Sequence, residues 1–359
     1  MTAAPLAHAT RSAPSQQRRG RPARRRPRSG PLAATAVGLA LLAVLAVVSV
    51  FVGARAIAPT DVLHALTDLD PTDAAQRVVI DLRLPRTALA ALTGAALGVA
   101  GTIMQALTRN PLAEPGILGI NAGAAACTAT GTALTAGVLG TAGTFGFAFA
   151  GAAVGALAVA ALGGVLRRGA DPVRLTLAGA ALSVMLGSYT QALLINQPTV
   201  FDTFRHWAVG SVQGRDGSIV LPALVVIVPA ILLAVALGPS FNALALGDDL
   251  GRSVGASPRK VLVTGAVLVV LLAGGATAVA GPFAFVGLVA PLAVRLVTGP
   301  DHRWILPLSA VAAADLVLAA DIVGRVLVPS SEVEASIVTA IVGAPVFIAL
   351  ARRRRLVRL

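Results

Sequence analysis

The sequence predicts an all-α, polytopic membrane protein with about ten membrane-spanning helices, and three observations predict this class. Of the 359 residues, 56% are hydrophobic and only 13% are charged. The hydrophobic residues gather in runs of about 20, the length that crosses a bilayer core of roughly 30 Å. Small residues are frequent, with 37 glycines in the chain, and small residues let helices pack closely in lipid.

The chain begins with an arginine-rich tail, residues 1–31, that we expect to be disordered because it has no hydrophobic periodicity. A nucleic-acid-binding arm is the alternative. However, a basic segment directly before a membrane span is the common signal for the cytoplasmic side, so we expect no nucleic-acid partner. The first predicted span, 32–52, is longer than the apolar part of a usual signal peptide, so we expect it to be retained rather than cleaved near Ala54.

The same criteria place nine further spans along the chain and a short basic cytoplasmic C-terminus at 353–359. Residues 32–352 therefore form one predicted transmembrane domain. Two short helices are predicted between spans: Thr60–Leu66, capped by Thr60 or Asp61, and Phe201–Val209. The nine spans are 87–107, 117–138, 145–166, 174–195, 219–238, 261–280, 282–298, 304–322 and 335–351.

The distribution of basic residues predicts the orientation of these spans. The tail, the segments between spans on the same side and the C-terminus hold 22 of the 29 basic residues, whereas the opposite side holds seven. Because basic residues collect on the cytoplasmic side, both termini are predicted to be cytoplasmic. The protein is then a multi-pass protein of a cell membrane.

The longest polar interruption in the second half of the chain is 239–260, which lies between two predicted spans. We predict a short amphipathic helix here, capped by Ser240 or Asn242 and ending near Val254 and Gly255. On the cytoplasmic side, such a helix offers a handle to a protein outside the membrane. The alternative is an interfacial helix that lies on lipid.

Several classes of function are disfavoured by what the sequence lacks. One cysteine, Cys127, and four scattered histidines provide neither a disulfide framework nor a set of metal ligands, so no cofactor or metal is expected. The phosphate-binding pattern Gly-x-x-x-x-Gly-Lys-Ser/Thr is absent from the sequence, so any ATP hydrolysis must come from a partner. A secondary transporter remains the alternative of a different class, although it would be expected to carry several charges at mid-membrane.

Several motifs, in the same order along the chain, resemble the signature of the FecCD-type ABC permeases, which import iron–siderophore chelates, haem and vitamin B12. The resemblance covers about residues 32–352. Its motifs are RLPR (83–86), GAAL (94–97) with Gly101 and Gln105, RNPLAEPGILG (109–119), LGDD (246–249) with Leu250, Ser253, Val254 and Gly255, GPFAFVGLVAP (281–291) with Arg295, ADIVGR (320–325) and VTAIVGAPVF (338–347).

This resemblance implies the fold and the partners of the chain. The fold would be that of a type II ABC importer permease (BtuC-like) in the bacterial plasma, or inner, membrane. A second permease subunit, identical or paralogous, would share a central path with it. Two cytoplasmic ABC ATPases would hold ATP and magnesium, and an extracellular substrate-binding lipoprotein would deliver a metal chelate. A ferric siderophore ranks first, with haem and cobalamin as alternatives.

The resemblance also implies roles for particular residues. Docking of the binding protein would use Arg83, Arg86 and Arg325; alternatively, Arg325 pairs with Asp321 one turn earlier and Arg86 anchors the start of its span. Cytoplasmic turn residues that contribute to gating would be Asn110, Pro111, Pro115 and Gly116, and a tight turn at the opposite side would use Gly281 and Pro282. Contact with the ATPase would involve Leu246, Gly247, Asp248, Asp249, Leu250, Arg252 and Gly255.

Three positions depart from the family pattern. Leu292 follows Pro291 where the family usually has histidine, and Glu332-Val333-Glu334 stands where the family has Glu-Leu-Pro. Asp315 places a carboxyl group in the middle of the ninth predicted span. An ionisable group at that depth is costly and normally faces a cavity or a partner. We therefore expect Asp315 to line the path or contact another subunit; the alternative is a protonated side chain that is hydrogen-bonded inside the bundle.

Overall fold

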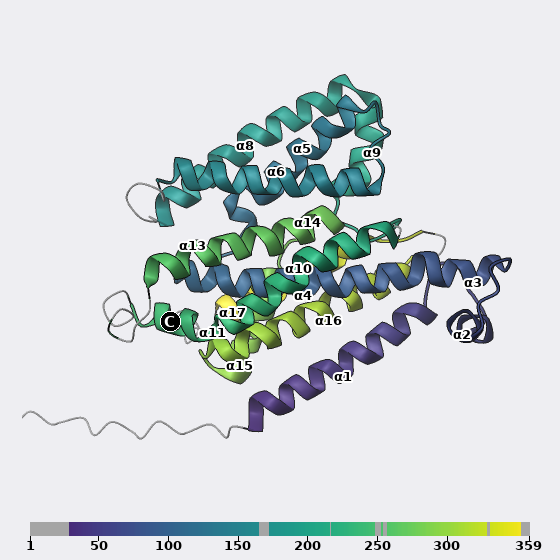
Figure 1. Ribbon diagram of the computed structural model, residues 1–359, viewed down its shortest axis with the longest axis horizontal. Helices are drawn as coiled ribbons and strands as arrows, with labels where there is room; N and C mark the ends of the chain where they lie inside the picture. The colour runs from purple at the N-terminus through teal and green to yellow at the C-terminus, as the bar shows by residue number, and fades with distance from the viewer. Residues whose placement is uncertain are drawn as a thin grey trace, which may run out of the picture.

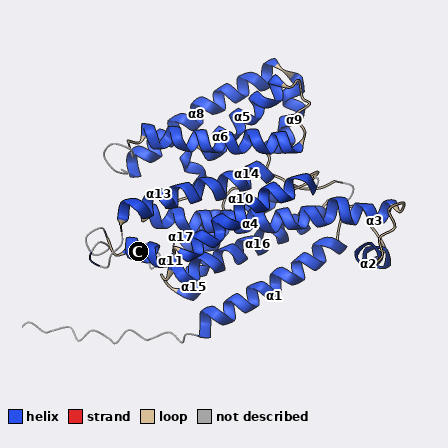
Figure 2. Ribbon diagram, in the orientation of Figure 1, coloured by secondary structure: helices blue, strands red, loops and turns tan. Residues whose placement is uncertain are grey.

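The computed structural model describes residues 29–164, 172–215, 217–247, 253, 257–328 and 331–352. In these residues the regular structure is helical, apart from one isolated bridge between Val328 and Ser331 (Figure 2). A helix occupies each of the ten predicted spans. They are α1 (Ser29–Phe51), α4 (Leu84–Thr108), α5 (Ile120–Leu134), α6 (Thr141–Leu162), α8 (Pro172–Asn196), α10 (Val220–Ala236), α13 (Pro258–Val269) continued by η4 (Val270–Gly274) and α14 (Gly275–Ala280), α15 (Val286–Thr298), α16 (His302–Val326) and α17 (Ala335–Ala351).

The shorter elements mark the two ends of the bundle (Figure 1). One end, which we call the α11 end, carries α11 (Gly238–Ala245), the end of α4 and the starts of α13 and α16. The opposite end, which we call the α2 end, carries α2 (Pro59–Thr67) and α3 (Ala74–Val78). The π-helical turn η1 (Val79–Arg83) joins α3 to α4, so that 74–108 is one continuous helix of 35 residues.

Both predicted short helices are present, as α2 and as α9 (Pro198–Ala208). The predicted cap of the first by Thr60 or Asp61 is wrong. This helix begins at Pro59, and the N-cap is Ala58, which makes no side-chain hydrogen bond to the helix. Proline fits the first helical turn because its backbone nitrogen has no hydrogen to leave unpaired. A 3-10 turn, η3 (Gly217–Ile219), precedes α10.

The core of the first layer is the pair α4 and α16, whose backbones touch through glycines. A Cβ atom placed on Gly94 would lie 2.4 Å from the carbonyl oxygen of Ala313, and one placed on Gly98 would lie 2.2 Å from that of Ser309. Only a residue without a side chain allows so close an approach, as is common between helices in lipid. Helix α1 packs against α16 on one side of this pair.

A second layer contains α5, α6, α8 and α9 (Figure 1). Glycines hold α5 against α6 in the same way, because a Cβ atom on Gly151 would lie 2.3 Å from the carbonyl oxygen of Gly123. Helix α14 packs against α6 and connects the two layers. Helix α8 lies at the outer edge of the second layer, with most of its surface uncovered in the single chain.

Two of the ten helices are shorter than predicted, because the segments before them enter the bundle. Helix α5 has 15 residues and α15 has 13. A Cβ atom on Gly101 would lie 1.7 Å from the carbonyl oxygen of Gly287, near the start of α15. Since Gly101 precedes the end of α4 by seven residues, α15 starts about 10 Å inside the bundle. Irregular backbone at membrane depth requires burial in protein, and the packing against α4 provides it.

Candidate functional site

At the α2 end, a cluster of charged side chains joins α4, α16 and the segment before α17. Arg86 donates from Nε and Nη2 to Asp321, with the Nη2–Oδ1 distance 2.8 Å, and from Nη1 to Oε2 of Glu332 at 2.8 Å. This forked geometry is the strong form of an arginine–carboxylate pair. Asp321 has 1% of its side chain exposed, so the charges compensate each other away from water. Glu332, which directly precedes the departures from the family pattern at Val333 and Glu334, is therefore a partner of Arg86.

Two further guanidinium groups cap the end of α1. Arg325 donates to the carbonyl oxygens of Ser49 and Val52 and pairs with Asp321. Arg83 donates from Nη1 to the carbonyl oxygens of Val50 and Phe51, at 2.9 Å each. The last carbonyl groups of a helix lack partners within the helix and carry partial negative charge, so two buried cations stabilise them.

The predicted docking role of Arg83, Arg86 and Arg325 lacks the exposed guanidinium groups that it requires. Arg83 and Arg325 are 5% and 3% exposed, and Arg86 has 13% of its side chain exposed. The alternative for Arg325, a pair with Asp321 within the same helix, is confirmed. Sequence reasoning missed the full cluster because its members are up to 246 positions apart. The one signal of it in the sequence was the presence of opposite charges at the ends of neighbouring spans.

Two irregular segments, 109–119 and 281–285, meet inside the bundle. The backbone N–H of Phe285 donates to Oε1 of Glu114 at 3.1 Å. A Cβ atom on Gly287 would lie 3.4 Å from Cδ of Pro115. We call these four residues, Glu114, Pro115, Phe285 and Gly287, the central junction.

The predicted turn residues divide between the start and the interior of the 109–119 segment. Asn110 begins the turn after α4, with its Oδ1 accepting from the N–H of Leu112 at 2.9 Å, and Pro111 follows it. Pro115 opens a 3-10 turn, η2 (Pro115–Leu118), and Gly116 lies beside Asn121. The first two thus form the expected turn at the α11 end, whereas the last two lie deeper, close to α15 and α5.

The predicted tight turn at Gly281 and Pro282 is wrong in form. These residues begin a five-residue connection that runs from the end of α14 back into the bundle. Gly281 has φ +74°, and a Cβ atom there would lie 2.2 Å from the carbonyl oxygen of Trp207; Gly210, at φ +83°, makes the reciprocal approach to Pro282. Only glycine tolerates both this backbone conformation and this distance. The pair locks the 281–285 connection to the segment after α9.

At the α11 end, α11 is joined to α16 by neutral and charged polar groups. Nδ2 of Asn242 donates to Oδ1 of Asp301 at 2.6 Å, and Oδ1 of Asn242 accepts from the N–H of His302 at 2.8 Å. Phe241 is fully buried beside the ring of His302. Arg109, at the end of α4, donates from Nη2 to the carbonyl oxygen of Leu244 in α11 at 3.2 Å. Helix α11 is therefore fixed to both α4 and α16.

The predicted coupling helix differs from the observed one. Helix α11 begins at Gly238 and ends at Ala245, so neither Ser240 nor Asn242 caps it; its N-cap is Leu237, directly after α10, and Pro239 lies in its first turn. Leu246 is exposed, and Gly247 has φ +95°, the tight-turn conformation expected of it. The other predicted coupling residues, Asp248, Asp249, Leu250, Arg252 and Gly255, lie outside the described residues.

Asp315 is 9% exposed and faces α1, where a Cβ atom on Gly38 would lie 3.9 Å from its Oδ2. Its Oδ1 atom has no hydrogen-bond partner among the described residues. In Figure 1, α1 and α8 lie on opposite sides of the α4–α16 pair. Asp315 is therefore remote from the open face of α8, and its role in lining the path or contacting another subunit stays a prediction.

The open face of α8 carries polar and small residues at helical spacing. Ser183, Gly187, Ser188 and Gln191 line a shallow groove of about 590 Å³ together with the apolar residues Val184, Ala192 and Ile195, and Gly187, Ser188 and Gln191 are exposed in the single chain. Helix α8 also has the lowest mean hydropathy of the seven long apolar helices of the described chain. Polar side chains directed at lipid are costly, so this face meets water or protein. Sequence reasoning missed this face of α8, although the helical spacing of these residues indicated it.

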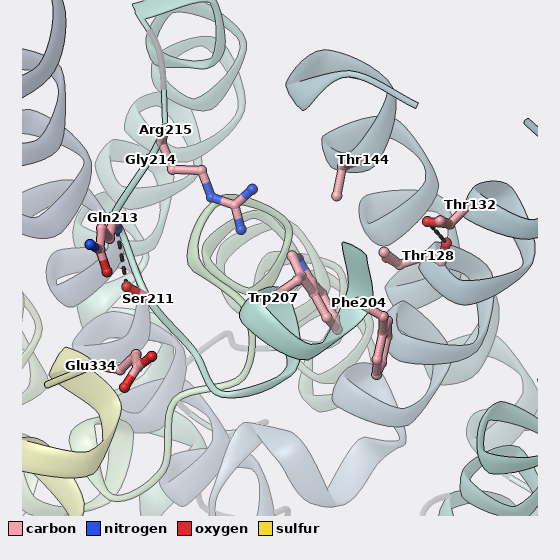
Figure 3. A pocket seen from close by; sticks show the side chains of 10 residues that line it. All are labelled: Thr128, Thr132, Thr144, Phe204, Trp207, Ser211, Gln213, Gly214, Arg215 and Glu334. Carbon is pink, nitrogen blue, oxygen red and sulfur yellow. Dashed lines mark hydrogen bonds between the residues drawn. The ribbon is translucent and has the colours of Figure 1, made fainter. Parts of the chain in front are cut away.

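A second, more enclosed cavity of about 400 Å³ lies between the two layers toward the α2 end (Figure 3). Thr128 and Thr132 of α5 and Thr144 of α6 form one wall, and Arg215 and Glu334 lie on the opposite side. The aromatic side chains of Phe204 and Trp207, from α9, form the base between them. Within the described residues, no three His, Cys, Asp or Glu side chains are arranged to hold a metal ion.

Comparisons with known proteins agree with these features. The sequence model of the FecCD transport family matches residues 41–353. The chain is 41% identical to the ferric enterobactin transport system permease protein FepD of Escherichia coli (strain K12), covering 88% of this chain and 94% of that protein. It is 35% identical to the hemin transport system permease protein HmuU of Yersinia pestis, with the same two coverages. A metal-chelate type ABC transporter solved in an inward-facing conformation superimposes with a TM-score of 0.78 at 24% identity, over 89% of this chain and 99% of that one.

Proposed function

Because the chain belongs to the FecCD transport family, we propose that it is the membrane-spanning permease subunit of an ABC importer whose cargo is a ferric siderophore. Two relatives support this cargo. One is the ferric enterobactin permease, and a second relative, 40% identical over 81% of this chain, is the probable siderophore permease YfiZ of Bacillus subtilis (strain 168). Haem, as in the hemin permease relative, and cobalamin are the alternative cargoes.

The observation that carries the proposal is the open polar face of α8. A single chain surrounds this groove only on one side, because most of α8 is uncovered. A second permease subunit, identical or paralogous, would cover the face and enclose a path between the two copies. Serine and glutamine offer a large polar chelate hydrogen bonds without a fixed charge, and glycine adds no bulk, so the walls would bind the chelate weakly and let it pass.

Helix α11 supports the assignment of an ATPase contact to the α11 end. The helix is joined to α4 through Arg109 and to α16 through Asn242. A force applied by an ATPase at α11 would therefore reach the two most buried helices of the first layer. The chain itself is a transport subunit, and ATP and magnesium would be held by two partner ATPases. An extracellular binding lipoprotein would deliver the chelate at the α2 end.

This arrangement requires the α11 end to face the cytoplasm, as the excess of basic residues at that end also indicates. The test uses single cysteines in a Cys127→Ser background, at Asp70, in the exposed α2–α3 connection, and at Lys260, which is exposed at the start of α13. An impermeant thiol reagent applied to intact cells is expected to label position 70 and to leave position 260 unlabelled until the cells are opened. The reverse pattern would overturn the orientation.

The cargo is tested by growth of a deletion strain on defined nutrients. We expect loss of growth when a ferric siderophore is the only iron source, and restored growth when the chain is supplied again. Growth on haem as iron source, and cobalamin-dependent growth, should be unchanged. If only haem or only cobalamin use is lost, the family assignment stands but the siderophore is the wrong cargo. If no growth condition distinguishes the strains, the import function itself is contradicted.

A further inference from the structure

The central junction contains a carboxyl group that no predicted role uses. Glu114 lies between Ala113, which is 3% exposed, and Pro115, and its Oε1 accepts the N–H of Phe285 at 3.1 Å. Phe285 is the N-cap residue of α15 and has φ +66°, a left-handed backbone conformation that residues other than glycine rarely adopt. This strained residue is thus held by the hydrogen bond that its N–H donates to a carboxyl group about 170 positions earlier in the chain.

The chemistry of α15 explains why a carboxylate is suited to this position. The first N–H groups of a helix have no partner within the helix and carry partial positive charge. Helix α15 starts inside the bundle, where Glu114 and Phe285 are only partly exposed. The Glu114 carboxyl supplies both an acceptor and a negative charge there. Pro115 then packs against Gly287 in the first turn of the same helix.

The segment that carries Glu114 is also attached to α11. Arg109, five positions before Glu114, donates to the carbonyl oxygen of Leu244 at 3.2 Å. The turn between them is closed by Asn110, whose backbone oxygen accepts from Ala113 and whose side chain accepts from Leu112. One compact segment therefore contacts α11 at one end of the bundle and the start of α15 in its interior.

The interior contact continues to α17. A Cβ atom on Gly343 would lie 2.7 Å from Cβ of Phe285, and the rings of Phe285 and Phe347 are 6.2 Å apart. Any displacement of Phe285 must therefore move α17 or separate from it. Helix α17 has exposed apolar residues such as Ile341, at 66%, so it borders either lipid or the second subunit.

We propose that Glu114 is a positioning residue for transport: its hydrogen bond to Phe285 makes the start of α15 follow the 109–119 segment when α11 moves. This inference rests on the proposed function, because it takes α11 as the element that an ATPase displaces. Without the bond, α11 and the 109–114 turn can move while α15 stays in place. ATP hydrolysis would then continue with the chelate no longer passing the membrane.

The test compares Glu114→Ala with Glu114→Gln in the transporter reconstituted with its ATPase and binding protein. Alanine removes the acceptor, whereas glutamine keeps an oxygen at the same place. Loss of a hydrogen bond to a charged group predicts a fall of about tenfold in ferric chelate uptake for Glu114→Ala. ATPase binding and ATP hydrolysis should stay within about twofold, and Glu114→Gln should keep most of the uptake.

Leu112→Ala is the matched control, because Leu112 is 43% exposed in the same segment and the backbone N–H by which it takes part in the turn is kept. If it lowers uptake as much as Glu114→Ala, the integrity of the segment and not the bond to Phe285 is what matters, and the proposal is overturned. The same conclusion follows if Glu114→Ala transports normally or if Glu114→Gln falls equally far. Should Glu114→Ala fail to reach the membrane, Glu114→Asp, which shortens the side chain by one carbon, replaces it under the same criteria.

A second measurement does not depend on the cargo. Ala284 is exposed next to the junction, so a single cysteine there, in a Cys127→Ser background, reports on the start of α15. We expect ATP to change its rate of modification by a small thiol reagent, and Glu114→Ala to abolish the change. If the wild-type chain imports no ferric chelate but shows this response, the cargo is wrong and the role of Glu114 stands. An unaltered response in Glu114→Ala would overturn that role.

Discussion

The two layers of the molecule use the same glycine packing but treat their polar side chains differently. In the first layer, 78% of the most apolar stretch of the α4 helix is buried, and the charges of Arg86, Arg325, Asp321 and Glu332 neutralise one another inside the chain. In the second layer, only 17% of the corresponding stretch of α8 is buried, and its polar residues point outward (Figure 1).

This difference separates a part that is complete in one chain from a part that is not. Glycine-mediated contacts hold α4 to α16 and α5 to α6 equally closely, so packing density does not distinguish the layers. What differs is where hydrogen-bonding groups find partners. The first layer pairs the charges of Arg86, Arg325, Asp321 and Glu332 with one another and provides the frame, whereas Ser188 and Gln191 of α8 are exposed in the single chain. Substitutions in the first layer should therefore affect folding, and those on α8 should affect transport.

The largest effect should come from Asp321→Asn, which breaks the buried cluster. Arg325 would lose its charged partner and Arg86 would keep only Glu332, and an uncompensated buried charge costs about 3–5 kcal/mol. We expect little protein in the membrane and a strongly lowered unfolding temperature in detergent. Asp202→Asn in α9 is the control, because its pair with Arg205 is exposed and 3.8 Å long, worth about 0–1 kcal/mol. Equal stability of both variants would contradict a structural role for the cluster.

The positions of the ten helices could be predicted because length and hydrophobicity follow directly from the requirement to cross a bilayer. The two short helices, α2 and α9, could also be predicted, because polar residues and helix formers alternate in their sequences. The depth at which a segment lies in the bundle could not be predicted from the sequence. Residues 109–119 and 281–285 have turn residues whether they lie at the surface or meet inside the bundle, and only tertiary contacts such as that between Glu114 and Phe285 distinguish the two.

The arginines show the same limit in electrostatic form. Arg83, Arg86 and Arg325 were correctly placed at one end of the bundle, because charges collect at the ends of spans. Whether such a side chain faces a partner protein or the end of α1 depends on which helices are neighbours. That information resides in pairs such as Arg86 with Glu332, far apart in the sequence. Glu114 was overlooked for the same reason, since its partner is a backbone N–H.

A smaller effect, which tests the comparison directly, is expected from the same substitution in the two layers, Gly98→Val and Gly187→Val. The new Cβ atom at position 98 would lie 2.2 Å from the carbonyl oxygen of Ser309, so α4 and α16 would have to separate. Overpacking of this kind costs about 1–3 kcal/mol. We expect Gly98→Val to lower the unfolding temperature, with uptake reduced only in proportion to the folded protein that remains.

At position 187 a new Cβ atom would have no neighbouring atom within 4 Å, so the change in stability should stay within about 0.5 kcal/mol. The side chain would instead project into the groove beside Ser183 and Gln191, replacing polar surface with two methyl groups where the cargo is proposed to pass. Initial rates of chelate uptake, divided by the amount of folded protein and compared with ATPase binding, should fall for Gly187→Val and stay normal for Gly98→Val. If Gly187→Val transports at the wild-type rate, α8 does not line the path, and its polar face must be covered by a subunit contact alone.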